Sequence, residues 1–161
     1  MIFKYFWIVF IITSLFNWFN SIRKIKNNND IPEELKTGYY KFYHVFSLSM
    51  FLPWVIVGIG QLCGLTNNVF DYFHPRTLNP IVLLFHLYII VSYIITIYYI
   101  FFKDGADFFV KHPGIIVFQG FGGTKNLTSK SSIKLFFAVC LLGSIAAIVM
   151  MWTLDFPTFK I

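Results

Sequence analysis

The chain has 161 residues, of which 57% are hydrophobic and 12% are charged, with a mean hydropathy of +0.69 and a formal net charge of +6. Soluble domains carry about 25% charged residues, and disordered chains combine low hydrophobicity with high charge, so this composition argues against both classes. The basic residues lie at the ends of apolar runs, which is typical of membrane topology signals and not of nucleic-acid binding. We therefore expect a small integral membrane protein whose first partner is the lipid bilayer.

The first apolar run covers residues 3–19, about the minimum length of a membrane-spanning helix. No small-residue cleavage site follows it, so an uncleaved span is favoured over a signal peptide. The second run covers 45–64 and contains Pro53, which predicts a kink because proline lacks an N–H and crowds the carbonyl of Ser49. The two remaining runs, at 81–102 and 133–152, complete an all-α bundle of four transmembrane helices in a single domain.

The connections between these runs cover 20–44, 65–80 and 103–132. Ten of the 13 Lys and Arg residues lie in or at the edge of the first and third connections. The positive-inside rule therefore predicts that 20–44 and 103–132 are cytoplasmic, with 65–80 and both termini on the non-cytoplasmic side. The bacterial inner membrane is the location that we expect.

Short interfacial helices are predicted within the two basic connections. Asp30 is a candidate N-cap before a helix at about 32–42, and Asp104 is a candidate N-cap for a helix at 104–112. The segment 120–125 is rich in glycine but lacks the spacing of a phosphate-binding loop, so we expect a flexible connector.

Small residues in two of the spans predict close helix packing. The second span carries a G-x-x-x-G pattern, and the fourth span carries a similar set of small side chains. These two spans are expected to approach each other, within one chain or between two chains. The residues concerned are Gly58, Gly60, Gly64, Gly143 and Ala147.

Polar side chains within the second and third spans have two interpretations. They form interhelical hydrogen bonds, which are ordinary in helix bundles, or they line a polar path through the membrane. We favour hydrogen bonds, with a specific bond between His86 and Gln61. The complete set is Gln61, His86, Tyr88, Ser92, Thr96 and Tyr99.

Two connections carry dense polar chemistry and are candidate interaction surfaces. These candidates are Asp71, His74 and Arg76 on the outer side, and Asp104, Asp107, Lys111 and His112 on the inner side. The inner group lacks the i, i+4 spacing of a helical metal site, so no metal is predicted. No cofactor is predicted either, because His44 and His86 differ in depth by roughly 20 Å and could not both ligate one haem.

No serine-nucleophile motif, catalytic carboxylate pair or dinucleotide fingerprint is present, so we do not predict an enzyme. The favoured function is a non-enzymatic accessory or interaction component of a membrane assembly, which binds other membrane proteins or forms a homo-oligomer. One alternative is a self-assembling channel or carrier with a polar path along the third helix. A further alternative, based only on size and architecture, is an immunity or defence membrane protein.

Overall fold

The computed structural model describes residues 5–120 and 123–154. Four of its helices are long and apolar enough to cross a membrane, which confirms the four predicted helical segments. They are α1 (Phe6–Asn27), α2 (Glu33–Leu62), α3 (Pro80–Ile97), which continues into the π-helical turn η4 (Tyr98–Phe102), and α5 (Lys130–Thr153).

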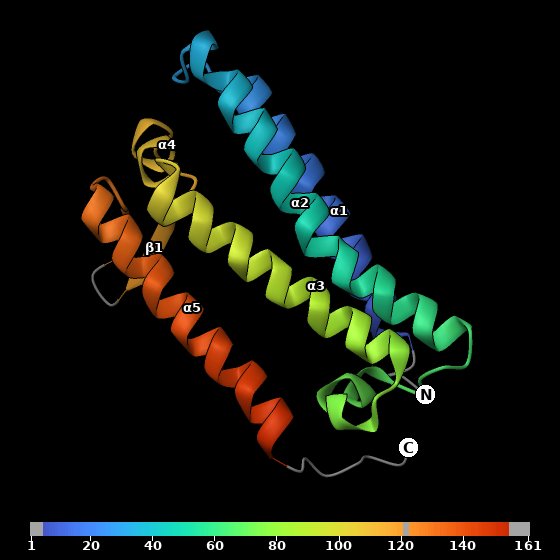
Figure 1. The fold of residues 1–161 in the computed structure, drawn as a ribbon. Helices are drawn as coiled ribbons and strands as arrows, with labels where there is room; N and C mark the ends of the chain where they lie inside the picture. Colours follow the sequence, from blue (N-terminus) through green and yellow to red (C-terminus); the bar gives the residue numbers. More distant parts are fainter. Residues whose placement is uncertain (1–4, 121–122, 155–161) are drawn as a thin grey trace.

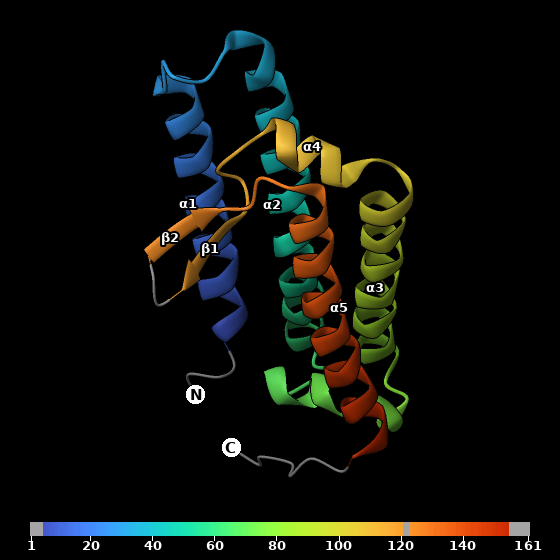
Figure 2. The same cartoon turned by 90° about the vertical axis from the view of Figure 1, so that its left-hand side faces the viewer.

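Figures 1 and 2 show the long helices running side by side, with the short helices of the connections at the two ends of the bundle. α1 packs along α2, and α2 packs along α3. One end carries the short 3-10 helices η2 (Val69–Phe73) and η3 (Pro75–Thr77), and we call it the η2 end. The other end carries the short helix α4 (Gly105–Lys111), which joins η4 to α5, and we call it the α4 end.

Two helices extend beyond the expected membrane spans at the α4 end. α1 continues to Asn27, where Lys24 and Lys26 lie in its last turn and interact favourably with the helix dipole. The separate interfacial helix expected at 32–42 does not exist, because α2 begins at Glu33 and continues through this segment into the span. No proline interrupts the chain between Pro32 and Pro53, so nothing in that segment stops the helix.

The third connection contains the predicted short helix and an unpredicted hairpin. α4 begins after Asp104, but that residue has a φ of 55° and makes no side-chain capping bond. Strands β1 (Val117–Gly120) and β2 (Gly123–Asn126) pair antiparallel, where we expected a flexible connector. Two short segments separated by two residues in a glycine-rich sequence are typical of a hairpin. The hairpin was not predicted because the glycines were interpreted only as a failed phosphate-binding loop.

The buried residues form one cluster at each end of the bundle. The cluster at the η2 end is Val57, Tyr72, Ile81 and Val82, and the cluster at the α4 end is Ile100, Ala106, Phe109 and Ile133. Large apolar side chains between the two ends point outward, for example Phe16, which is 63% exposed, and Leu142, which is 69% exposed. Such a surface suits lipid contact, because a soluble monomer rarely exposes so large an apolar area.

Candidate functional site

The proline in α2 is accommodated by a tyrosine from α3. Pro53 has no N–H to donate to the carbonyl of Ser49, which would otherwise lack its helical partner. The Tyr88 hydroxyl donates to that carbonyl oxygen at 2.8 Å. The Ser49 hydroxyl donates instead to the Phe46 carbonyl at 2.9 Å. Tyr88 therefore joins α2 and α3 at the carbonyl that Pro53 leaves without its helical donor.

The two aliphatic hydroxyl groups along this part of α3 bond to the helix itself. Ser92 donates to the Tyr88 carbonyl and Thr96 donates to the Ser92 carbonyl, each at 2.8 Å. Tyr99 is 41% exposed, and its backbone and ring lie against Gly105 at the start of α4. The Ser92 and Thr96 hydroxyls are thus satisfied within their own helix.

His86 lies at the centre of a buried hydrogen-bond network at the η2 end. The residue is 1% exposed, with Nε2 2.9 Å from the Tyr72 carbonyl oxygen and Nδ1 3.3 Å from Trp152 Nε1. An indole N–H can only donate, so Nδ1 accepts and Nε2 carries the hydrogen that it donates to Tyr72. The two bonds select one neutral tautomer and join η2, α3 and α5.

The expected hydrogen bond between His86 and Gln61 is not made. Gln61 is 6% exposed, and neither its amide nitrogen nor its amide oxygen has a hydrogen-bond partner among the described residues. Tyr72 explains the difference, because this residue of the connecting loop enters between α2 and α3 and supplies the acceptor for His86. A sequence-based pairing of two helices could not anticipate a third segment between them.

Tyr72 is held in place by a glycine. A Cβ atom on Gly60 would lie 2.2 Å from the Tyr72 hydroxyl, so only glycine leaves room for it. The hydroxyl lies near the carbonyls of Ile56 and Val57, at 3.3 and 3.4 Å. Burial is the main influence on the pKa of Tyr72 and raises it above its ordinary value. The side chain is therefore a neutral hydrogen-bond donor. This role of Tyr72 was not predicted from the sequence.

The outer polar residues Asp71 and Arg76 hold this loop together. Asp71 Oδ2 accepts from the backbone N–H groups of Asn67 and Asn68, at 2.6 and 3.3 Å, within a capping box that begins η2. Arg76 donates from Nε to the Trp152 carbonyl at 2.5 Å and from Nη2 to the Thr153 carbonyl at 2.6 Å. A cation at these last carbonyls stabilises the C-terminal end of α5.

The third outer candidate, His74, lines a shallow pocket of about 220 Å³. The other lining residues come from the same loop and from the end of α5, and they are Arg76, Thr77, Met151 and Leu154. Because Arg76 is already bonded to α5, this pocket has little free polar chemistry to offer a ligand.

At the α4 end, His112 fixes α4 against α2. Its Nδ1 lies 2.7 Å from the Phe108 carbonyl oxygen, and a Cβ atom on Gly38 would lie 2.0 Å from its Nε2. The Tyr39 hydroxyl donates to the Pro113 carbonyl at 2.7 Å. His112 is therefore a buried packing residue.

The other inner candidates remain accessible. Asp104 and Lys111 are exposed, and Asp107 forms an ion pair with Lys130 at the start of α5. Among the described residues, no group of three or more His, Cys, Asp or Glu side chains could hold a metal ion. Cys63 and Cys140 are both free and exposed.

The predicted packing glycines have different surroundings. A Cβ atom on Gly58 would lie 2.7 Å from the ring of Trp7 in α1. Gly64 has a φ of 71° just beyond the end of α2, a conformation that favours glycine. A Cβ atom on Gly143 would meet no heavy atom of a neighbouring element within 4 Å, and Ala147 is exposed. The second and fourth spans therefore do not approach each other within the chain at these positions, and an approach between two chains stays a prediction.

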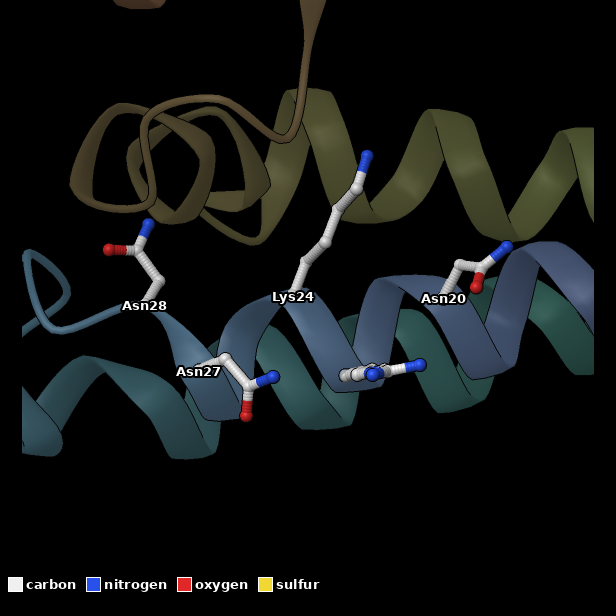
Figure 3. Close-up of a pocket in the computed structure, with 5 residues that line it drawn as sticks. Asn20, Lys24, Asn27 and Asn28 are labelled. Carbon is white, nitrogen blue, oxygen red and sulfur yellow. The ribbon is translucent and has the colours of Figure 1, made fainter.

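A polar pocket of about 490 Å³ opens beside the last two turns of α1 (Figure 3). Its lining residues recur at helical spacing along one side of α1, and they are Asn20, Arg23, Lys24, Asn27 and Asn28. Lys24 and Asn28 project in the same direction in Figure 3. Sequence analysis treated this segment as a connection, although its i, i+3, i+4, i+7 spacing was a signal for one polar helix face.

Comparison of the chain with protein-family models, with curated proteins and with solved structures finds no significant match.

Proposed function

We propose that this chain is an integral membrane protein that acts as a non-enzymatic component of a membrane assembly. In this proposal the four long helices cross the bilayer, the α4 end faces the cytoplasm, and both termini lie on the opposite side. The concentration of Lys and Arg in the connections at the α4 end supports this orientation. The bacterial inner membrane is the proposed location.

The observation that carries the proposal is the incomplete packing of α5. Only Ile133 and Leu141 are buried along its 24 residues. Its ends contact α4 and η3, whereas Gly143, Ala146 and Ala147 in its middle are exposed. Small residues let the backbone of another membrane helix approach closely. We infer that a helix of another membrane protein, or of a second copy, packs against this part of α5.

The polar groups of α3 support an accessory role over a channel. The Ser92 and Thr96 hydroxyls donate to carbonyls of their own helix, and His86 uses both ring nitrogens within the protein. The side chains that line a channel instead direct their polar groups toward water or an ion.

The test is the particle mass of the protein extracted from native membranes with its lipid shell. We expect a mass above that of one 18.8 kDa chain with its lipids, with other polypeptides present. Gly143→Leu should reduce it to the single-chain value, because the added side chain blocks close approach. Leu84→Phe, at an exposed position of α3, is the matched control and should leave the mass unchanged.

A single-chain mass for the unmodified protein would refute the proposal. A mass equal to a small whole number of chains, with no other polypeptide, would replace the hetero-assembly with a homo-oligomer. Ion flux or turnover sustained by the purified protein would contradict the non-enzymatic accessory role.

A further inference from the structure

The pocket beside the end of α1 has the chemistry of an anion site. It combines two cations, Arg23 and Lys24, with the carboxamides of Asn20, Asn27 and Asn28, and no acidic residue lines it. Arg23 and Lys24 are exposed and form no ion pair with any described carboxylate. Arg and Lys supply only hydrogen-bond donors, so the pocket is rich in donors and positive charge.

Stabilisation of the helix end alone does not explain this set of residues. Cations in the last turn of a helix do interact favourably with its dipole. The neutral carboxamides contribute nothing to that effect, yet Asn20 lies one turn before the two cations and Asn27 and Asn28 lie one turn after them. Asn28 Oδ1 accepts from the Asp30 N–H at 2.8 Å, which orients that amide and leaves its NH₂ group available as a donor.

The surface next to the pocket is apolar and outward-facing. Phe19 precedes Arg23 by four residues and Phe16 precedes it by seven, so both lie on the same side of α1 as Arg23. They are 60% and 63% exposed. At 1.5 Å per residue they lie about 6 and 10 Å along the helix from Arg23, which is within the roughly 15 Å depth of one leaflet.

We propose that this pocket binds the headgroup of an anionic glycerophospholipid, whose acyl chains lie along Phe16 and Phe19. The phosphate accepts hydrogen bonds from Arg23 and Lys24, and the carboxamides bond the headgroup hydroxyls and ester oxygens. A free phosphate would use the donors but not the apolar surface below them. This inference rests on the membrane insertion proposed above and is independent of the α5 contact.

The test compares lipid retention by the full chain in micelles that contain phosphatidylglycerol and phosphatidylcholine in equal amounts. Native mass spectrometry counts each lipid bound per chain. We expect the unmodified protein to retain phosphatidylglycerol preferentially. Arg23→Gln together with Lys24→Gln should lower that preference by roughly thirtyfold, from about 1 kcal/mol for each cation near a headgroup and tenfold for each 1.4 kcal/mol.

The matched control is Lys26→Gln together with Lys41→Gln. It removes the same charge from exposed residues near the same end of the bundle that do not line the pocket. We expect the control to change the preference by less than threefold. Asn27→Leu keeps the charge, and it should lower the preference severalfold by removing a donor. It decides the question if the double variant fails to fold, as judged by helical circular dichroism.

Three results would overturn the proposal. The first is no preference for phosphatidylglycerol in the unmodified protein. The second is an equal loss in the two double variants, which would show a diffuse field of positive charge instead of a site. The third is displacement of the lipid by inorganic phosphate but not by chloride at matched ionic strength, which would assign the pocket to a free phosphate. A failed lipid test leaves the mass test on Gly143 unaffected, so the two proposals can be refuted separately.

Discussion

Tyr88→Phe should destabilise the fold only because α2 contains a proline. The substitution removes the hydroxyl that donates to the Ser49 carbonyl at 2.8 Å. Interhelical hydrogen bonds in membranes are worth about 0.6–2 kcal/mol, and the loss lies toward the upper value because the Pro53 ring offers no alternative donor. We expect a decrease of about 1–2 kcal/mol in the free energy of unfolding.

A double-mutant cycle with Pro53→Ala isolates the cause. Alanine at 53 restores an N–H that can donate to Ser49 in the ordinary helical pattern. Tyr88→Phe should then cost less than about 0.5 kcal/mol in that background, which makes the two positions coupled.

The assay is reversible unfolding in mixed micelles, monitored by circular dichroism during a titration with sodium dodecyl sulfate. Tyr93→Phe is the matched control, because it removes the same atom from a half-buried tyrosine of the same helix whose hydroxyl has no hydrogen-bond partner among the described residues. An equal loss of unfolding free energy on Tyr88→Phe in the unmodified chain and in Pro53→Ala would refute the reasoning. It would show that the restored N–H does not replace the tyrosine as the donor to the Ser49 carbonyl.

Four further substitutions test the packing of the bundle. Gly38→Ala should displace His112 and increase hydrogen exchange in α4. Its control, Gly143→Ala, meets open space, so it should leave exchange in α4 unchanged and raise the free energy of unfolding by up to about 1 kcal/mol. Faster exchange of α4 in both variants would contradict this prediction. Gln61→Leu should raise the unfolding free energy by about 1 kcal/mol in the same unfolding assay, because it removes two unsatisfied buried polar atoms, and a decrease would indicate that the amide has a partner in the membrane. Arg76→Gln should increase hydrogen exchange over the last turn of α5, and unchanged exchange would show that the bonds to its final carbonyls contribute little.

The sequence was sufficient to predict the four long helices, because each is a long apolar run. In lipid, a helix satisfies all the backbone hydrogen bonds of such a run within itself. The position of α4 was also predictable from Asp104 and Pro113. The residues at which α1 ends and α2 begins, at the α4 end, were not predictable in this way. Polar residues such as Asn20 and Lys36 marked where the apolar runs stopped, but a helix continues through polar residues as readily as through apolar ones.

The polar network of the η2 end was only partly predictable. His86 was identified as a buried polar residue, since an ionisable group deep in an apolar run must find a partner. Its actual partners, Tyr72 and Trp152, lie 14 and 66 residues away. Neither contact follows from helix periodicity, because one partner lies in a loop and the other lies at the end of α5.

The two buried clusters differ in how soon they can form as the chain is synthesised. All four residues of the cluster at the η2 end lie between Val57 and Val82, so this part of the structure is complete once the third span has emerged. The cluster at the α4 end includes Ile133, so it must wait until the first turn of α5 is made. A ribosome-bound chain that stops before α5 would therefore already hold α2 and α3 together at one end, with the other end still open to a partner.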